Sequence, residues 1–512
     1  MLRVVSCHEQ ALAPTVPFSR LRPGKRLTSG TWLEEWEEAP RRKFSLHQRI
    51  HTRLPAALSL TGDRNIRFAD VALGRADMAE FIAQLEPEEL ACLVRGEGMC
   101  SHKVTPGVAS AFGGTSDSLL EKGIPLASTA DGPSGIRMDN GAHATLMPSG
   151  TLLACTWDPV LIERLYAMEG KELQRNQIDL LLGPGMNVHR HPLNGRNFEY
   201  FSEDPLLTGM MAAATVRGIR SGGGIATLKH FACNSQEQAR AQANAVVSAR
   251  ALREIYLRGF EYAVKEGGAM AVMTAYNPIN GHWSASNYCL NTTILRDDWG
   301  FQGIVMTDWW AKMNDAIAGG DATIHNTAAM IRAQNDLYMV VNNNGAEINA
   351  GEDNTLMALA DGTLTLGELQ RCASNILSFM LHTQVVKRGE VPKVRVPTIT
   401  TDNGLYIEDA IKIAPESRLR YTEPLAIYIP HAGAYDLLVS VNAAAMPLAQ
   451  TATNLLFNGK FVSTIQTRGT LGQRVVQKLC RVQLEPGYYR VQTEVIKAGL
   501  EIDWLEFKRV DS

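Results

Sequence analysis

Short apolar runs that end in polar side chains constrain the fold of this chain most. The run at 303–310 (GIVMTDWW) places Asp308 and Trp309 directly after four apolar or β-branched residues. Four upstream runs end in the same way, at 131–133 (DGP), 187–191 (NVHRH), 229–230 (KH) and 274–277 (TAYN). In parallel α/β barrels the active site is formed at the carboxyl ends of the strands. Five such endings in order predict one shared pocket, whereas a single one would equally suit an ordinary polar loop.

The alternation of strand-like and helix-like segments predicts a barrel. Strands are expected at 178–182, 225–228, 269–274, 303–306 and 337–341, and helices at 78–93, 159–176, 205–220, 249–266 and 366–382. The helical segments between strands are long enough to return the chain in parallel. We therefore predict an α/β fold, a TIM-like (β/α)8 barrel over 65–385.

The segments on either side of the predicted barrel have a different texture. Residues 1–64 are rich in Arg, Pro and Glu without a clear period, and are interpreted as an irregular segment, compatible with a remnant of a preceding domain. Residues 386–401 include a Pro/Thr/Val-rich stretch and are predicted to be a linker. From 402 to 510, alternating apolar runs are separated by turn sequences such as Asn458-Gly459 and Pro486-Gly487. This pattern predicts an all-β sandwich.

Composition limits the classes of ligand and compartment. The 512 residues carry 50 basic and 53 acidic side chains, a net charge of −3, which gives no bulk electrostatic reason to bind nucleic acid or an anionic membrane. No apolar run reaches the ~18 residues of a membrane-spanning helix. The eight cysteines are scattered without a CxxC motif and are expected to be buried free thiols. A neutral ligand and a cytoplasmic location are expected, and a homo-oligomer is compatible with this composition.

Neither a metal nor a cofactor is expected. His189 and His191 flank Arg190 and lack carboxylate or thiolate partners at a recognisable spacing. The glycines at 222–224 precede a strand rather than follow one, which favours a helix-to-strand turn over a phosphate-binding loop.

These segments together resemble the family 3 glycoside hydrolases, the retaining β-glucosidases and their relatives. The matching segments are 130–133 (ADGP), 183–187 (GPGMN), 195–199 (GRNFE), 201–205 (FSEDP), 229–231 (KHF), 252–257 (LREIYL) and 306–309 (MTDW). The resemblance covers about 65–385 and implies that Asp308 is the nucleophile that forms a covalent glycosyl ester. It also implies a sugar-binding ring of Asp131, Arg196, Lys229, His230 and Tyr276.

The chemistry of these residue types agrees with that assignment. Retaining cleavage needs an ionised carboxylate at the anomeric carbon, and a carboxylate at a strand end is held rigidly; the alternative for Asp308 is a helix cap. Asp131 would accept hydrogen bonds from sugar hydroxyls while Lys229 and His230 donate them. Alone, such a Lys-His pair would usually lie on the surface.

Two further residues have alternative interpretations. Arg196 would bind hydroxyls or keep Asp308 ionised, or else would form an ion pair with Glu199, Glu203 or Asp204, and both can hold. Trp309 would offer an apolar face to the sugar ring or would belong to the core.

The second carboxyl group that retaining hydrolysis requires is not apparent. In most of the family this general acid lies on a separate α/β sandwich domain, and the chain resembles the branch that carries that domain before the barrel, with its front removed. The segment 229–234 (KHFACN) also lacks the family's barrel-loop His-Asp acid pair, which weighs against an N-acetylglucosaminidase. Glu237 suits a supporting role better than that of the acid.

The expected function is therefore a retaining β-glycosidase, in particular a β-glucosidase, acting on a glucoside or β-linked oligosaccharide and impaired by the missing acid. The alternatives are a non-catalytic sugar-binding remnant, or one half of a split enzyme whose acid comes from a separate polypeptide. The C-terminal segment resembles carbohydrate-binding modules of the β-sandwich type, and a purely structural role is equally open.

Overall fold

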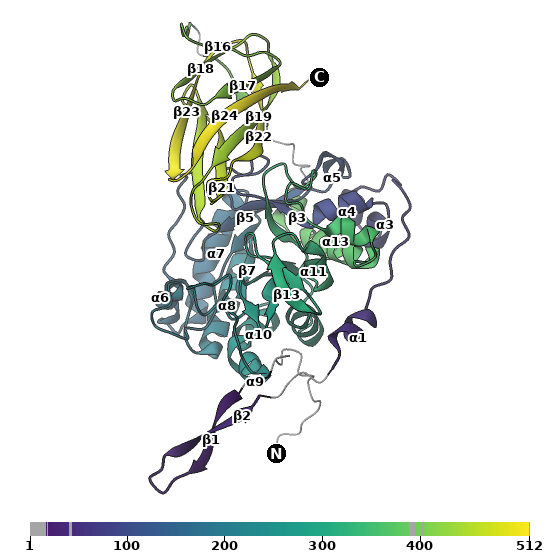
Figure 1. The fold of residues 1–512 in the computed structure, drawn as a ribbon, viewed down its shortest axis with the longest axis vertical. Helices are drawn as coiled ribbons and strands as arrows, with labels where there is room; N and C mark the ends of the chain where they lie inside the picture. Colours follow the sequence, from purple (N-terminus) through teal and green to yellow (C-terminus); the bar gives the residue numbers. More distant parts are fainter. Residues whose placement is uncertain (1–16, 18, 40–43, 389–395, 402–403, 511–512) are drawn as a thin grey trace.

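The computed structural model describes residues 17, 19–39, 44–388, 396–401 and 404–510 (Figure 1). Its centre is an eight-stranded sheet in the order β11-β8-β7-β6-β5-β4-β3-β14. The strands are β3 (Arg95–Glu97), β4 (Ser110–Gly113), β5 (Leu126–Asp131), β6 (Leu180–Leu182), β7 (Ile225–Phe231), β8 (Ala271–Thr274), β11 (Ile304–Met306) and β14 (Tyr338–Val341). An isolated bridge between Met306 and Leu337 joins the two edges, so the sheet is nearly closed into a barrel.

The barrel is not parallel throughout, so that part of the prediction is wrong. β4 runs antiparallel to both β3 and β5, with Glu97 opposite Ala111 and Ser110 opposite Thr129. The chain between β3 and β4 contains no helix, and a connection without a crossover reverses the strand direction. The other neighbouring pairs of the sheet are parallel.

Helices cover the outside of the barrel. The longest are α7 (Pro159–Arg175), α8 (Pro205–Gly222) and α13 (Leu366–Met380). Asp158 and Asp204 accept hydrogen bonds from the first free amides of α7 and α8, whose first residue is proline in both cases. Gly223 caps the end of α8, and its φ of 99° favours glycine, as expected for a helix-to-strand turn.

The remaining elements of the barrel region are short. They are α2 (Phe68–Ala72), α3 (Met78–Ala83), α4 (Pro87–Leu93), α5 (Asp117–Glu121), α6 (Gly150–Ala154), α9 (Ala249–Ala251), α10 (Arg258–Lys265), α11 (Thr327–Arg332), α12 (Thr355–Ala360), α14 (Gln384–Lys387), the 3-10 turns η1 (Asn197–Glu199) and η3 (Ser284–Ser286), the π-helical segments η2 (Leu252–Tyr256) and η4 (Cys289–Asp298), and the strands β9 (Pro278–Ile279), β10 (His282–Trp283), β12 (Met313–Asp315) and β13 (Gly319–Thr323). The helix predicted at 78–93 is thus two helices, because Pro87 starts a new one.

The N-terminal segment is more regular than predicted. β1 (Ser19–Arg26) and β2 (Trp32–Glu38) form an antiparallel hairpin that extends away from the barrel (Figure 1). Trp32 and Trp36 are exposed on this hairpin. Because the hairpin does not bury one face, its sequence lacks the alternation of apolar and polar residues that would have predicted strands. α1 (Leu46–His51) follows and packs against the barrel core through Leu46 and Ile50.

In the region predicted as a β-sandwich, two five-stranded sheets share one hydrophobic core. One has the order β15-β22-β19-β24-β17 and the other β16-β18-β23-β20-β21. The strands are β15 (Thr398–Ile399), β16 (Ile411–Lys412), β17 (Glu416–Arg420), β18 (Leu425–Ile429), β19 (Gly433–Asn442), β20 (Gln450–Phe457), β21 (Lys460–Arg468), β22 (Val475–Leu484), β23 (Gly487–Lys497) and β24 (Glu501–Val510). β15 lies within the predicted linker, of which 389–395 is outside the described residues. We call 398–510 the C-terminal unit.

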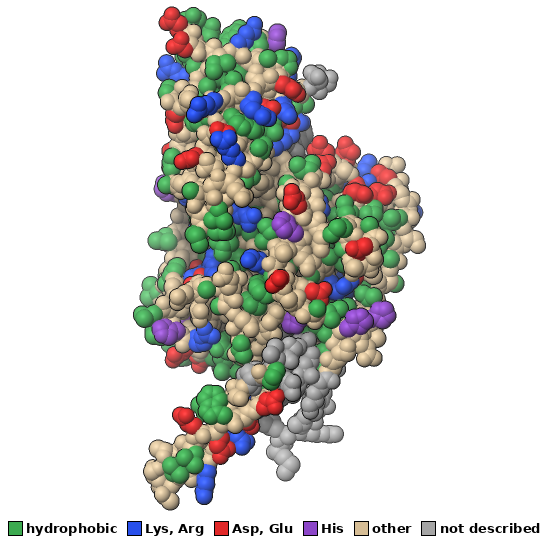
Figure 2. Space-filling model, viewed as in Figure 1, with side chains coloured by type: hydrophobic (Ala, Val, Ile, Leu, Met, Phe, Trp, Pro, Cys, Tyr) green, Lys and Arg blue, Asp and Glu red, His purple; other side chains and the backbone are tan. Residues whose placement is uncertain are grey.

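The surface and the cysteines show two further features. On the face shown in Figure 2, acidic and basic side chains are interspersed, as the balanced composition suggests. None of the helices in the described part of the chain is long and apolar enough to cross a membrane. Six of the seven described cysteines are buried, but Cys155 is exposed at the end of α6, where its predicted burial is wrong; Cys7 is outside the described residues.

Candidate active site

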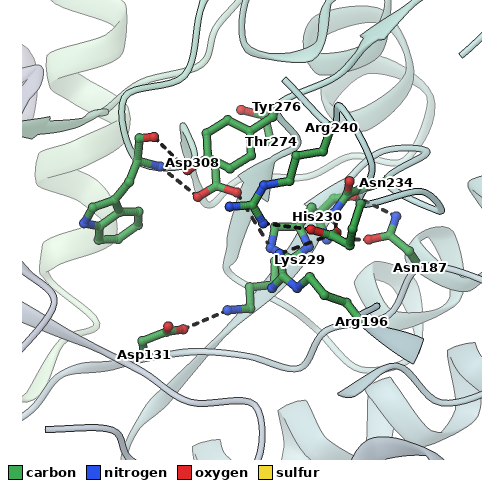
Figure 3. Close-up of polar contacts among 12 residues, drawn as sticks. Asp131, Asn187, Arg196, Lys229, His230, Asn234, Arg240, Thr274, Tyr276 and Asp308 are labelled. Atoms are coloured by element: carbon green, nitrogen blue, oxygen red, sulfur yellow. Dashed lines mark hydrogen bonds and ion pairs between the residues drawn. The ribbon is translucent and has the colours of Figure 1, made fainter. Parts of the chain in front are cut away.

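One cavity of about 480 Å³ lies at the carboxyl ends of the barrel strands, within the range of small-molecule sites. All seven residues predicted from the sequence line it: Asp131, Arg196, Lys229, His230, Tyr276, Asp308 and Trp309. Asp131 ends β5, Lys229 and His230 lie at the end of β7, and Asp308 follows β11 by two residues. Strand ends therefore bring together side chains that are far apart in the sequence (Figure 3).

Asp308 is held by its own backbone and lies beside an imidazole. The amide of Trp309 donates to Oδ1 of Asp308 at 2.8 Å, and Nε2 of His230 lies 3.7 Å from Oδ2. No helix starts at this position, so Asp308 is not a helix cap. Among the described residues, no lysine or arginine nitrogen comes within salt-bridge distance of Asp308.

Burial sets the protonation of this pair. Burial raises the pKa of Asp308, and the guanidinium groups of Arg240 and Arg196 oppose that shift. Burial, together with Arg196 and Lys229, lowers the pKa of His230 well below its ordinary value. His230 is therefore neutral near pH 7, and its Nδ1 lies 3.1 Å from the hydroxyl of Tyr200. A neutral imidazole can form a hydrogen bond with a sugar hydroxyl without forming an ion pair with the Asp308 carboxylate.

Asp131 forms a second polar centre in the cavity. Nζ of Lys229 donates to Oδ1 of Asp131 at 2.8 Å, and Nη1 of Arg137 donates to Oδ2 at 3.3 Å. Burial alone would raise the pKa of Asp131, but the charges of Lys229 and Arg137 outweigh it, and the pKa lies below its ordinary value. Lys229 is buried rather than on the surface.

Arg196 forms an ion pair and also faces the cavity. Its Nε donates to Oε1 of Glu199 at 2.7 Å, so the ion-pair alternative is present, and Arg196 still lines the cavity. Asp204 does not contribute, because it caps α8. Glu237 bonds to Nη1 of Arg240 at 2.9 Å, which agrees with a supporting role.

The two aromatic residues pack together. The Tyr276 hydroxyl donates to the backbone oxygen of Trp309 at 2.7 Å, and the guanidinium of Arg240 lies 4.8 Å from the centre of the Tyr276 ring. Trp309 is buried and also lines the cavity, so it belongs to the core and to the site wall.

Sequence reasoning missed several residues of the cavity. Arg137, Asp139 and Arg240 lie on loops after β5 and β7, where arginine and aspartate are common surface residues. Gln450 and Lys497 come from the C-terminal unit, more than 300 residues from Arg137 and Asp139 along the chain. No local signal could have found these two, whereas the closeness of Arg137 to the Asp131 motif offered a hint.

The carboxylates of the cavity differ in their partners. Asp131 pairs with Lys229, Asp139 with Lys497 at 2.7 Å, and Glu199 with Arg196. A general acid must carry its proton before the reaction, and an ion pair with a base favours the ionised form of a carboxyl group. Only Asp308, among the described carboxylates that line the cavity, has no lysine or arginine partner.

The described residues offer no group of three or more His, Cys, Asp or Glu side chains placed to hold a metal. Nδ1 of His191 accepts from the amide of Leu193 at 3.1 Å, which gives this histidine a local structural role.

Comparison with known proteins places these residues in a family. Residues 75–378 match the Glycosyl hydrolase family 3 N terminal domain. A β-glucosidase of Ruminococcus albus is 44% identical over 99% of this chain and 54% of its own length. The crystal structure of a β-glucosidase from Paenibacillus barengoltzii is 56% identical, with a TM-score of 0.77 over 98% of this chain and 54% of that one. β-Glucosidase 3B from Thermotoga neapolitana in complex with glucose is 37% identical, with a TM-score of 0.55 over 61% of this chain and 44% of that one. The chain spans about half the length of the first two of these relatives, and it belongs to glycosyl hydrolase family 3.

Proposed function

We propose that this chain carries the glucoside-binding half of a retaining β-glucosidase, with Asp308 as its nucleophile. The observation that carries the proposal is the contrast among the cavity carboxylates, of which Asp308 alone lacks a lysine or arginine partner among the described residues. Its oxygen Oδ1 is fixed by the Trp309 amide, while Oδ2 remains for attack. The names of the relatives from Ruminococcus albus and Paenibacillus barengoltzii support the substrate class.

The first step forms one bond and breaks one. Asp308 Oδ2 attacks the anomeric carbon, the bond from that carbon to the leaving oxygen breaks, and a glycosyl ester results. Water then hydrolyses the ester and releases the sugar with its original configuration. Burial raises the pKa of Asp308, and the charges of Arg240 and Arg196 oppose that shift and so favour the ionised nucleophile. Lys229, Asp131 and neutral His230 supply donors and acceptors for ring hydroxyls.

We propose that the general acid comes from outside the described residues, either from another polypeptide or from a further segment. Retaining glycosidases hold their two carboxyl groups about 5–5.5 Å apart. Asp131, Asp139 and Glu199 are each already engaged in an ion pair with a lysine or arginine.

The same contrast favours a second candidate, a protein that binds glucosides without turnover. The hydroxyl-binding groups are present in the cavity, whereas a proton donor is not evident among its described carboxylates. The two candidates differ in whether Asp308 reacts.

Covalent trapping separates them. A 2-deoxy-2-fluoro-β-glucoside with an activated aryl leaving group needs no general acid for the first step, and its fluorine slows the second. We expect the intact mass of the chain to rise by one fluoroglucosyl group, and peptide mapping to place it on Asp308. Asp308→Asn should remain unlabelled, with Glu237→Gln as a labelled control. Absence of labelling despite measurable glucose binding would favour the non-catalytic candidate, and labelling elsewhere would remove Asp308 as nucleophile.

A further inference from the structure

The C-terminal unit contributes side chains to the cavity. Gln450 is the first residue of β20 and Lys497 the last of β23, and these strands are neighbours, with Ala452 opposite Lys497. The start of β20 and the end of β23 therefore lie side by side at one end of the sheet. Gln450 and Lys497 line the same cavity as Asp308, and so does Leu448, two residues before β20.

These side chains hold Arg137 and Asp139. Nη2 of Arg137 donates to Oε1 of Gln450 at 3.1 Å, and its Nε donates to Oδ1 of Asp139 at 3.0 Å. Lys497 Nζ donates to Oδ1 of Asp139 at 2.7 Å and lies 3.3 Å from Oε1 of Gln450. With Asp131 on Nη1, the guanidinium of Arg137 is held on three sides, and its remaining N–H groups are left for a ligand.

The backbone of the loop that carries Arg137 and Asp139 also contacts β20 and β23. Nδ2 of Asn454, on β20, donates to the backbone oxygen of Asn140 at 3.1 Å. The α-carbon region of Gly141 faces Ile496, since a methyl group added there would meet its Cδ1 at 3.5 Å. The C-terminal unit thus contacts both the backbone and the charged side chains of the loop after β5.

We propose that Gln450 and Lys497 are positioning residues of the glucoside-binding site, which orient Arg137 toward the sugar hydroxyls at the Asp131 end of the cavity. The inference rests on the proposed function and makes the C-terminal unit a part of the site rather than a separate sugar-binding module. Arg137 is only half-buried and its side chain is long, so without its partners it would sample several rotamers. Gln450 and Lys497 remove that freedom before the sugar binds.

The test is a binding measurement that needs no turnover. The full chain is titrated with D-glucose and with its 3-, 4- and 6-deoxy analogues, by calorimetry. Gln450→Ala and Lys497→Met should each weaken glucose binding about 10- to 150-fold, the range for losing a hydrogen bond to a charged group. The loss should vanish for the deoxy analogue that lacks the hydroxyl bound by Arg137, and Lys497→Arg should restore much of the affinity.

A matched control exists in the same unit. Lys478 pairs with Asp436 at 2.7 Å, as Lys497 pairs with Asp139, but it does not line the cavity. Lys478→Met should leave all affinities unchanged. Equal losses for every analogue, or a loss in the Lys478→Met control, would show a general structural effect and overturn the inference. Unchanged binding in Gln450→Ala and Lys497→Met would overturn it directly, whereas failure of the unaltered chain to bind any sugar would instead contradict the proposed function.

Discussion

The dependence of turnover on the leaving group is the sharpest consequence of the cavity's charge pattern. The comparison is between p-nitrophenyl β-glucoside, whose leaving group departs without a proton, and cellobiose, whose leaving group requires one. Asp131, Asp139 and Glu199 are each paired with a lysine or arginine, so we expect none of these three described carboxyl groups to serve as the general acid. General acid catalysis accelerates such reactions about 10²–10⁴-fold. We expect the rate for cellobiose to lack this whole factor, and the rate for the aryl glucoside to be unaffected.

The assay follows both halves of the reaction with the purified chain. We expect weak release of nitrophenolate and almost no glucose from cellobiose. Azide should accelerate aryl turnover, because it attacks the glycosyl ester without a general base, and β-glucosyl azide should be the product. Asp308→Ala should abolish nitrophenolate release while glucose binding persists.

Two results would refute this reasoning. Robust hydrolysis of cellobiose would show that a carboxyl group within the chain donates a proton, and Glu199 and Glu237 would be the first to replace by glutamine. Nitrophenolate release that survives in Asp308→Ala would show that another residue forms the ester.

Two further predictions concern charge. The rate of labelling by the fluoroglucoside should rise with pH as Asp308 ionises, with a midpoint above the ordinary aspartate pKa of about 3.9, because burial raises the pKa of this carboxyl. Arg240→Met should move the midpoint higher still, and an unchanged midpoint would contradict the role of Arg240. Lys229→Met should lower the free energy of unfolding by about 1–3 kcal/mol in urea titrations near neutral pH, less than for a fully buried pair because Asp131 is partly exposed and keeps Arg137. The pKa of Asp131 is lowered in the folded state, so this stabilisation is fully present above the unfolded-state pKa and is lost as the pH falls from that value through the folded-state pKa. A stability difference between Lys229→Met and the unaltered chain that persists in acid would refute the assignment.

Burial on both faces made the barrel strands recognisable from the sequence. β7, β8 and β11 lie inside the barrel wall, and such strands appear as continuous apolar runs that end where the polar site begins. Asp308, Lys229 and Asp131 could be placed for that reason. β3 and β4 have three and four residues, too few for a period, and the antiparallel direction of β4 went unrecognised with them.

The remaining cavity residues depend on contacts that no local pattern encodes. Gln450 and Lys497 stand at strand ends, where polar side chains usually face solvent, and only the packing of the C-terminal unit on the loop after β5 turns them inward. Arg137 and Arg240 similarly occupy loops with ordinary surface composition. The sequence therefore predicts the cavity residues at the ends of the barrel strands better than those contributed by loops and by the C-terminal unit.

The paired charges also indicate how a sugar would lie in the cavity. Figure 3 shows Asp131 with Lys229 on one side and Asp308 with Arg240 on another. At the Asp131 end of the cavity, the carboxylates of Asp131 and Asp139 are neutralised by Lys229, Arg137 and Lys497. This end therefore suits the neutral hydroxyls of a sugar. Asp308 keeps its charge free of direct pairing, which suits the positive charge that develops at the anomeric carbon. Because Gln450 and Lys497 occupy the Asp131 end, we expect the aglycone, and any acid that protonates it, to approach from the Asp308 end.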